Sequence, residues 1–432
     1  MSQHVIPPTR LSNALSRRAQ WAGGETIASV LMARTLDQPH LVSLAAGFVD
    51  QQTLPVEPAR EAFEAVWSDP ELARAALQYG TTIGHAGLRA MILDRTLEAD
   101  RSAAPARDLS LRQVVVTAGS NQLLYLVSDA LLDPDDIVLC GAPTYFVYLG
   151  TLTNLGARAV GVEVDEHGII PEAVEEQLRR FERLGELGRV KAVYATPYYD
   201  NPTGATIPPE RRRRLVELAK RWSRDARLYV LEDIAYRELR YYGEDVPSML
   251  AFDPEGDTVV QAGTFSKSFS PGIRVGWGIV PQALLAPVLA AKGNIDFGSP
   301  NFNQVLMAAA VGQGLFDRHV ERLRAAYRGK LDTMLRACDE FLGPIEGVEW
   351  VRPAGGLYVW IRLPEPVDTG LDSPLFDRAV TEGVLYIPGV YCFPTSGRRA
   401  PANTLRLSFG IQSCESIRRG VAALARAVKH VM

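Results

Sequence analysis

The sequence predicts an α/β protein in which a large domain, with a mostly parallel sheet flanked by helices, is joined to a smaller α+β domain. The chain has 432 residues, and a single hydrophobic core stops growing at about 250–300 residues, so we expect more than one unit. Seven short runs rich in β-branched residues alternate with helical stretches through the first two thirds of the chain. After about Pro281 the pattern becomes mainly helical, with a few short strands near the end. This change predicts the second, smaller unit.

The seven runs predict the strands of the large sheet. Each run is apolar along its whole length, and this is typical of parallel strands that helices cover on both faces. The helical stretches between the runs supply that cover. The predicted strands are Val114–Thr117, Ile137–Cys140, Ala159–Val164, Lys191–Thr196, Leu228–Glu232, Thr258–Ala262 and Ile273–Val280.

The remaining segments complete the predicted domain division. Residues 1–56 are expected to form an N-terminal arm and a segment of the small domain, residues 57–300 the large domain, and residues 301–432 the C-terminal small domain. Apolar residues at helical spacing, and short β-branched runs, define the elements of these segments. Helices are predicted at Thr26–Leu36, at Glu57–Leu97 with a turn-rich break over Gln78–Gly87, at Gln304–Phe341 and from Ser416, and strands at Tyr358–Leu363, Val384–Ile387 and Thr404–Phe409.

Composition and charge exclude several classes of function. The 46 basic and 50 acidic residues give a formal net charge of −4, which argues against nucleic acid or an anionic membrane as a partner. No apolar run approaches the ~18–20 residues that span a bilayer, and the N-terminus lacks a secretory signal pattern. Four cysteines without a CxxC pair and six scattered histidines predict no disulfide framework and no metal site. We therefore expect a soluble, cytoplasmic protein, with the cationic run Arg211–Arg214 on a solvated helix face.

The residues that follow the predicted strands carry the chemical signals, because ligands of open α/β sheets bind outside the carboxyl ends of the strands. After the first strand, the small residues Ala118–Gln122 open a helix, which suits a phosphate group as well as a plain N-cap by Ser120. After the second strand, a rigid turn presents Tyr145. After the fourth, Asn201 precedes a proline that holds it extended. An ordinary loop is the alternative for this last segment.

Two later strand ends carry charged residues. Asp233 ends an apolar strand, where a carboxylate is costly unless a cation meets it, and Tyr236 follows three residues later. Lys267 lies among hydroxyl residues after the sixth strand, and Arg274 follows it. Only six of the 46 basic residues are lysines, and a lysine amine, unlike an arginine, can lose its proton and attack a carbonyl. An exposed turn is the alternative for Lys267.

Together these residues fit one cofactor, pyridoxal 5′-phosphate, which is an electron sink bound through a lysine with an aspartate on its ring nitrogen. The GxGxxG motif of nicotinamide sites and the GxxxxGK[ST] motif of phosphate loops are both absent. Asp233 would meet the ring nitrogen, Tyr145 would form an aromatic platform, and Lys267 would supply the amine. Asn201 and Tyr236 would add hydrogen bonds, and the phosphate would be received by Ser120, Asn121, Thr264, Ser266 and Arg274.

The sequence resembles the fold-type I pyridoxal-phosphate-dependent aminotransferases of class I/II. The resemblance rests on Asn-Pro-Thr-Gly at 201–204, on Ser266-Lys267 followed by Pro-Gly-Ile-Arg-Val-Gly at 271–276, and on Leu-Arg-Leu-Ser-Phe at 405–409. Their order and spacing match the family from Val42 to Phe409, and the 2-aminoadipate/kynurenine aminotransferase branch is the most similar. The resemblance implies an aspartate aminotransferase-like fold. It also implies transfer of the amino group of an L-amino acid to a 2-oxo acid, with 2-oxoglutarate as the expected acceptor.

The resemblance also implies a role for each motif residue. Lys267 would carry the cofactor as a Schiff base and move a proton between the substrate Cα and the cofactor C4′. Asp233 would keep the ring nitrogen protonated, and Tyr145 would stack on the ring. Asn201 and Tyr236 would hydrogen-bond the 3-oxygen, and Ser120, Asn121, Thr264, Ser266 and Arg274 would hold the phosphate.

Substrate binding and assembly follow from the same resemblance. Arg406 would bind the substrate α-carboxylate through two parallel hydrogen bonds, with Asn201 and Gly47 beside the substrate. Tyr79 would reach the phosphate of a neighbouring subunit, which implies a homodimer with shared active sites. Amino acid and 2-oxo acid substrates are therefore the expected partners, together with a second copy of the chain.

The sequence departs from the family pattern at several positions, and other functions remain open. Asp200 stands where many relatives have a neutral residue, Asn121 where glutamine is common, and Ala46 in a stretch that is usually rich in glycine. Arg34, within the poorly matching segment Trp21–Arg34, is a candidate for a distal carboxylate, with surface exposure as the alternative. A pyridoxal-phosphate lyase or cyclase would use the same fold and cofactor. A ligand sensor would need an N-terminal DNA-binding module, which the residues before Val42 are too few to form.

Overall fold

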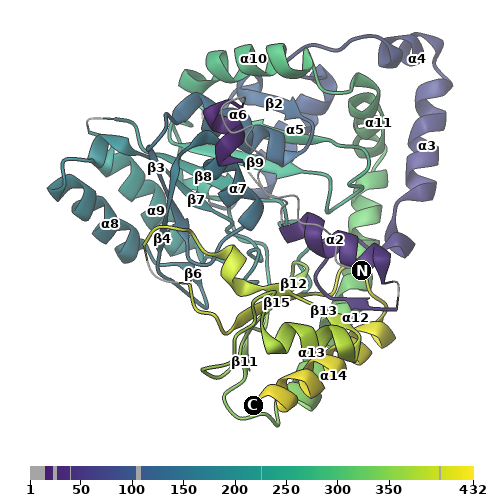
Figure 1. The fold of residues 1–432 in the computed structure, drawn as a ribbon. Helices are drawn as coiled ribbons and strands as arrows, with labels where there is room; N and C mark the ends of the chain where they lie inside the picture. Colours follow the sequence, from purple (N-terminus) through teal and green to yellow (C-terminus); the bar gives the residue numbers. More distant parts are fainter. Residues whose placement is uncertain (1–14, 23–26, 39, 104–108, 225, 398–399) are drawn as a thin grey trace.

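The computed structural model describes residues 15–432 apart from residues 23–26, 39, 104–108, 225 and 398–399. The described chain forms a seven-stranded sheet, a four-stranded sheet and two small strand pairs. Figure 1 shows the larger sheet in the upper part of the molecule and the smaller one below it, in yellow and green. The α/β class predicted from the sequence is confirmed.

The seven-stranded sheet has the order β2-β10-β9-β8-β7-β3-β4. All of its strands run in one direction except β10, which is antiparallel to both of its neighbours. The predicted strand Ile273–Val280 is shorter than expected, because residues 273–275 belong to the turn that follows Lys267. The strands are β2 (Val114–Thr117), β3 (Ile137–Gly141), β4 (Arg158–Val162), β7 (Val190–Ala195), β8 (Tyr229–Asp233), β9 (Val259–Thr264) and β10 (Gly276–Ile279).

Both faces of this sheet are buried, as its apolar strands predicted. In β2, Val114 and Val116 face one core, whereas Val115 faces the other. The face that includes Val115 is covered by α6 (Ser120–Leu131), α7 (Phe146–Leu155) and α10 (Gln282–Asp296). The opposite face is covered by α5 (Ala86–Ala99), α8 (Pro171–Arg183), α9 (Pro209–Trp222) and α11 (Asn301–Gly312), with α3 (Val56–Trp67) and α4 (Pro70–Leu77) outside them.

The smaller sheet is antiparallel and has the order β11-β12-β15-β14. Its core also receives the N-terminal segment, since β1 (Val42–Ser43) pairs with β13 (Val384–Leu385) in parallel. The strands are β11 (Glu349–Trp350), β12 (Tyr358–Arg362), β14 (Ile387–Pro388) and β15 (Thr404–Ser408). The helices around them are α12 (Leu315–Ala337), α13 (Pro374–Glu382) and α14 (Cys414–Val431), while α1 (Arg17–Trp21), α2 (Ile27–Asp37), β5 (Val164–Asp165) and β6 (Gly168–Ile169) complete the fold.

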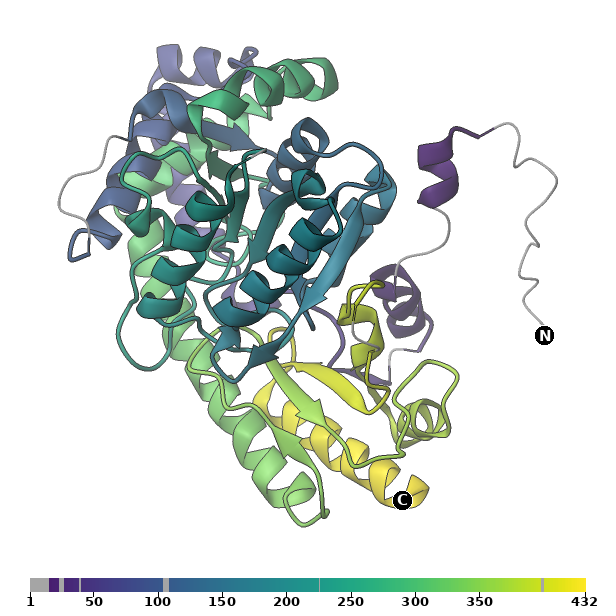
Figure 2. The same ribbon diagram turned by 90° about the vertical axis from the view of Figure 1, so that its left-hand side faces the viewer.

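One long helix joins the two cores. The predicted helix Gln304–Phe341 is in fact two helices, α11 and α12, because Gly314 takes a left-handed conformation (φ 67°) before α12. The first turns of α12 pack in the core of the larger sheet, and its later turns pack in the core of the smaller sheet. Figure 2 shows this helix running from the upper unit into the lower one. The domain boundary after residue 300 stays a prediction.

Two further properties concern the chain as a whole. Within the described residues, no helix combines the length and the apolar character needed to cross a bilayer. All four cysteines lie in described segments and are free thiols; three of them are buried and Cys414 is exposed. The carboxylates of Asp253, Glu255 and Asp257 lie together, but the Lys220 amine is 2.9 Å from Asp253 Oδ1 and also pairs with Glu255.

The close approach of β10 to the start of α6 gives a first prediction. A Cβ on Gly276 would lie 2.5–2.7 Å from backbone atoms of Gly119 and Ser120. We therefore expect Gly276→Ala to lower the free energy of unfolding by about 1–3 kcal/mol, because backbone has to move to accommodate the methyl group. Thermal unfolding measures this effect. In the control, Gly188→Ala, the added Cβ meets no atom within 4 Å, and an equal loss in both variants would contradict the prediction.

Candidate active site

The predicted site residues converge where the carboxyl ends of the parallel strands meet the smaller sheet. The larger sheet contributes the segments that follow β2, β3, β7, β8 and β9, as expected for an open α/β sheet. The smaller sheet contributes β12 and β15, and the N-terminal segment that follows β1 passes between them. The site is therefore built from parts of the chain that are far apart in sequence.

Asp233 is a buried carboxylate without a cationic partner. It is the last residue of β8 and is 4% exposed. The Tyr194 hydroxyl donates to its Oδ2 (3.1 Å) and the Ala235 amide to its Oδ1 (3.2 Å), but no described basic side chain forms an ion pair with it. Burial is the main reason that the pKa of Asp233 rises to about 6. A cation placed against this carboxylate would therefore be strongly favoured.

Asn201 and Tyr236 form a short hydrogen-bonded chain beside Asp233. Asn201 follows β7, and its Nδ2 lies 3.5 Å from the Tyr236 hydroxyl, which in turn lies 3.2 Å from the Tyr358 hydroxyl on β12. All three side chains are buried. Asp200, the departure noted in the sequence, accepts hydrogen bonds from the Thr203 hydroxyl (2.8 Å) and amide (3.3 Å), and burial raises its pKa to about 7. This carboxyl group holds the turn that presents Asn201.

Arg406 is a buried cation with only neutral partners. It lies on β15, is 2% exposed, and donates to Asn201 Oδ1 (2.8 Å) and to the carbonyl oxygen of Ala45 (2.7 Å). Its guanidinium group lies over the Tyr358 ring, 4.2 Å from the centroid. Its Nε is buried without a hydrogen-bond partner in the described structure. Because a buried charge is costly unless it is paired, an anion placed against this guanidinium would be favoured.

Lys267 points its amine toward the N-terminal segment. It follows β9, and its Nζ donates to the carbonyl oxygen of Gly47 (2.8 Å). A Cβ on Gly47 would lie 2.7 Å from the Tyr358 hydroxyl, so any larger residue would displace that ring. The amine therefore lies beside Gly47, which is itself close to Tyr358. No acidic side chain among the described residues forms an ion pair with it.

The start of α6 and the turn after β9 form a polar cradle. Gly119, with φ 89°, is the N-cap of α6, so Ser120 is the first helical residue and not the cap. The first amides of a helix lack partners within it and attract anions. Arg274 is exposed and donates to Ala118 O (2.9 Å) and Ser266 Oγ (3.3 Å), while Thr264 Oγ1 lies 2.9 Å from Ser266 Oγ. The φ of Arg274 is 50°, an unfavourable value for an arginine, which these contacts maintain.

The predicted aromatic platform lies next to this cradle. Tyr145 is the N-cap of α7 and is half-buried, and its hydroxyl group lies near the side chain of Asn121 on α6. Burial raises the pKa of the Tyr145 hydroxyl, so it stays protonated at neutral pH. The structure thus brings together the predicted phosphate, ring and amine positions.

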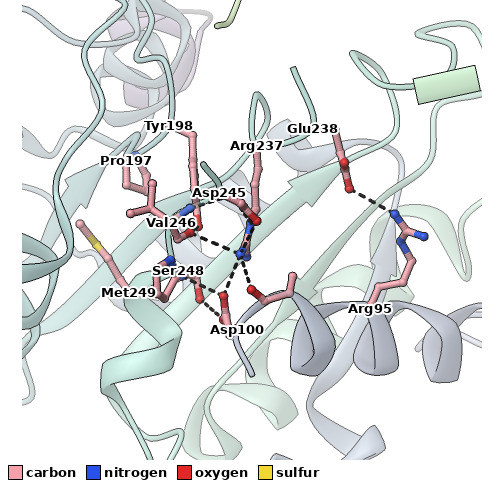
Figure 3. A network of polar contacts seen from close by, with 12 residues as sticks. Arg95, Asp100, Pro197, Tyr198, Arg237, Glu238, Asp245, Val246, Ser248 and Met249 are labelled. Carbon is pink, nitrogen blue, oxygen red and sulfur yellow. Dashed lines mark hydrogen bonds and ion pairs between the residues drawn. The ribbon is translucent and has the colours of Figure 1, made fainter. Parts of the chain in front are cut away.

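A buried ion-pair network supports the two loops that carry Asn201 and Tyr236 (Figure 3). Arg237, the residue after Tyr236, pairs with Asp100 (2.9 Å) and Asp245 (3.0 Å), and its guanidinium lies over the Tyr198 ring at 5.1 Å. Arg212 lies over the same ring at 4.0 Å and donates to three backbone carbonyls. The expectation of a solvated face for this arginine was wrong, because Arg212 is fully buried against Tyr198.

Two predicted residues lie outside this cluster. Tyr79 is 82% exposed and packs edge-on against Phe297, which is 61% exposed, with 5.4 Å between the ring centroids. Arg34 is half-buried, with its guanidinium over the Phe376 ring of α13 at 5.2 Å. Part of the segment Trp21–Arg34 lies outside the described residues.

Sequence reasoning missed two tyrosines of the site. Tyr194 lies inside β7 and donates to Asp233, and Tyr358 begins β12 and touches Tyr236, Gly47 and Arg406. Both occur within apolar strands, where a tyrosine is as common as any other aromatic residue. Only their polar neighbours in space distinguish them.

Comparison with known proteins identifies the family. The model of the family "Aminotransferase class I and II" matches residues 39–424. This chain belongs to that family. An aromatic-amino-acid aminotransferase of Thermococcus litoralis is 35% identical over 93% of this chain and 91% of its own length. A 2-aminoadipate transaminase of Thermus thermophilus is 34% identical over 99% of both chains. The protein is therefore a transaminase, and these relatives do not favour the lyase or cyclase alternative.

A solved structure supports the same fold and cofactor. The α-aminoadipate aminotransferase of Thermus thermophilus, complexed with N-(5′-phosphopyridoxyl)-L-leucine, superposes with a TM-score of 0.83 at 32% identity, covering 97% of this chain and 98% of that chain. The family depends on pyridoxal 5′-phosphate, and the aspartate aminotransferase-like fold is confirmed. The residues present here fit that cofactor, because the unpaired Asp233 can meet a ring cation and the α6 cradle can receive a phosphate.

The buried Asp233 gives a prediction for the cofactor-free protein. Its pKa in the folded protein, about 6, exceeds the ordinary 3.8, so its protonation stabilises the fold. This stabilisation is complete below pH ~3.8 and is lost as the pH rises through ~6. Since Asp233→Asn cannot ionise, we expect the variant to be as stable as the parent near pH 4. Near pH 8 it should be more stable by about 3 kcal/mol. Thermal unfolding at both values measures this, and a difference that does not grow with pH would contradict it.

Proposed function

We propose that this transaminase binds pyridoxal 5′-phosphate through Lys267 and binds the substrate α-carboxylate at Arg406. The observation that carries the proposal is two buried charges without ionic partners among the described residues, Asp233 and Arg406, with Asn201 and Tyr236 hydrogen-bonded in a chain to Arg406. One charge suits the ring nitrogen of the cofactor, and the other suits the carboxylate that every α-amino acid carries. A site with both features accepts cofactor and amino acid together.

Bound pyridoxal 5′-phosphate supplies an electron sink that stabilises negative charge on the substrate α-carbon. Asp233 holds a proton at the ring nitrogen, because an opposite charge at hydrogen-bonding distance outweighs the cost of its burial. The Lys267 amine attaches the cofactor and then moves a proton to and from the substrate α-carbon. Its bond to a neutral carbonyl, that of Gly47, leaves it free to change partner.

The other contacts orient the ring, the phosphate and the substrate. Asn201 and Tyr236 hydrogen-bond the ring oxygen, and Tyr145 stacks on the ring. Ser120, Asn121, Thr264, Ser266 and Arg274 hold the phosphate at the start of α6. Arg406 lies on the smaller sheet, whereas the cofactor residues lie on the larger one, so substrate binding brings the two units together and excludes water.

The proposed substrate class rests on the named relatives and on the aromatic rings beside Arg406. We propose an L-amino acid with a large side chain, aromatic or of the 2-aminoadipate type, as donor, and 2-oxoglutarate as acceptor. The named relatives act on aromatic amino acids and on 2-aminoadipate, and the rings of Phe146 and Tyr358 flank Arg406 here. We propose a cytoplasmic location, which the free cysteines favour.

We also propose a homodimer with shared active sites. The exposed aromatic pair Tyr79 and Phe297 lies near the exposed Leu77 and Ile295, and such apolar surface favours burial against a partner. If a second copy of the chain covered this surface, Tyr79 of one copy would lie within reach of the phosphate cradle of the other.

The function is tested by a half-reaction. Adding one L-amino acid without any 2-oxo acid should convert the bound cofactor stoichiometrically to its pyridoxamine form, measured by the absorbance spectrum. Borohydride reduction followed by peptide mapping should place the pyridoxyl group on Lys267, and Lys267→Ala should abolish both results. A label on any of the other five lysines, or release of the side chain of the substrate instead of amino transfer, would disprove the proposal.

Arg406→Lys separates substrate binding from cofactor binding. Lysine keeps the charge but loses the two-pronged geometry, so we expect the affinity for the amino acid to fall by about ten- to a hundredfold. The spectrum of the bound cofactor should remain unchanged, because its contacts lie on the larger sheet. Loss of the cofactor with unchanged amino-acid affinity would show that Arg406 has a different role.

Shared active sites are tested by complementation. Lys267→Ala and Tyr79→Phe chains, each defective alone, should regain part of the activity when they are refolded together, because one mixed site then carries both native residues. Sedimentation should show a dimer. A fully active monomer would contradict the proposal.

A further inference from the structure

An ion pair between a buried lysine and a half-buried aspartate lies on α10, the helix that packs against α6. Lys292, on α10, is 0% exposed, and its Nζ is 2.9 and 3.0 Å from the two carboxylate oxygens of Asp296, one helical turn later. Burial lowers the pKa of the Lys292 amine, and Asp296 opposes this effect. With so few lysines in the chain, a buried one needs a reason.

Asp296 occupies an unfavourable position for a carboxylate. It is the last residue of α10, where the partial negative charge of the helix end repels an anion. A buried ion pair by itself contributes little to stability, because the cost of removing two charges from water offsets their attraction. The pair is therefore explained by a hydrogen bond that the Asp296 carboxylate accepts from another residue.

The residue that donates this hydrogen bond is Gln122, in the first turn of α6. Its Nε2 donates to Asp296 Oδ2 (2.8 Å), and its Oε1 accepts from the Ala118 amide (2.7 Å). The carbonyl oxygen of Ala118 in turn accepts from Arg274 Nη2 (2.9 Å). The chain of contacts thus runs from Lys292 through Asp296, Gln122 and Ala118 to the exposed arginine of the cradle.

The Asp296 end of this chain of contacts is held in place by further hydrogen bonds. Phe297 O accepts from the Thr82 hydroxyl (2.7 Å), Ser299 O accepts from Gln304 Nε2 (2.7 Å), and the Ser299 hydroxyl donates to Asp296 Oδ2 (3.3 Å). Asp296 is therefore an anchored acceptor, and Gln122 can adopt one orientation only. Lys292 cancels the charge of Asp296, so the anchor does not repel a phosphate dianion bound at the cradle.

From this arrangement we infer that Gln122, oriented by the Lys292–Asp296 pair, is a positioning residue for the phosphate end of the cofactor. It fixes the peptide group of Ala118, and through it both the first amides of α6 and the guanidinium of Arg274. The inference rests on the proposed cofactor site. It adds three residues that touch neither cofactor nor substrate.

The test compares two cofactor forms on the reconstituted enzyme. The variants are Gln122→Met, which keeps the size but removes both hydrogen bonds, and Lys292→Met with Asp296→Leu, which removes the pair without leaving an unpaired charge. Affinity is measured for pyridoxal 5′-phosphate and for pyridoxal, which lacks the phosphate. Gln113→Met is the control, because Gln113 also makes two side-chain hydrogen bonds, with the Ser110 amide and the Gly256 carbonyl, but it precedes β2 whereas the cradle follows β2.

We expect both variants to bind pyridoxal 5′-phosphate about tenfold more weakly, in line with one lost hydrogen bond at a charged site. The affinity for pyridoxal should stay within about twofold of the parent value, since the ring contacts are intact. For the same reason, the pH midpoint of the bound cofactor's absorbance should shift by no more than about a few tenths of a pH unit. The control should match the parent in every measurement.

Four results would overturn the inference. Unchanged affinity for pyridoxal 5′-phosphate in both variants would show that Gln122 positions nothing. An equal loss for the two cofactor forms, or a shifted absorbance midpoint, would show a general structural effect. Loss confined to the double variant would remove Gln122 from the chain of contacts. A parent enzyme that binds no pyridoxal 5′-phosphate would instead refute the proposed function itself.

Discussion

Two buried charges without ionic partners in the described structure, Asp233 on the larger sheet and Arg406 on the smaller one, set the constraint on which the site depends. Each would be costly in an empty interior, and each is held by neutral donors and acceptors that leave its charge uncompensated. The Asn201–Tyr236 chain contacts Arg406 directly. The proposed binding of a ring cation at Asp233 and of a carboxylate at Arg406 would relieve this unfavourable arrangement.

Several other buried charges of the described chain have a close ionic partner, whereas Arg212 and Glu232 are held by backbone and amide groups. Arg237 is paired with Asp100 and Asp245, Lys292 with Asp296, and the Lys330 amine lies 2.7 Å from Asp50. In each case the partner is close and the charge is neutralised within the protein. By contrast with these described pairs, the junction of the two sheets leaves a buried carboxylate and a buried guanidinium for a ligand. This contrast separates the site from the structural ion pairs.

The N-terminal segment links the two charged positions. It enters the smaller unit through β1, and the carbonyl oxygens of Ala45 and Gly47 accept from Arg406 and Lys267. Asp50, a few residues later, is held by Lys330 on α12, the helix that packs in both cores. The N-terminal segment thus connects the smaller unit to the two side chains proposed to bind the substrate carboxylate and the cofactor.

The sequence by itself determined the strands of the larger sheet, the residues at their carboxyl ends and the cofactor chemistry. Continuous apolar runs identify buried parallel strands, and Asp233 and Lys267 are conspicuous because charged residues at such positions are rare. Only the tertiary structure decided the antiparallel direction of β10, the break between α11 and α12, the burial of Arg212, and the place of Tyr194, Tyr358 and Gln122 in the site. The reason is physical: strand direction, burial and a tyrosine's hydrogen-bond partner depend on contacts between segments far apart in the chain. Local sequence patterns carry no record of those contacts.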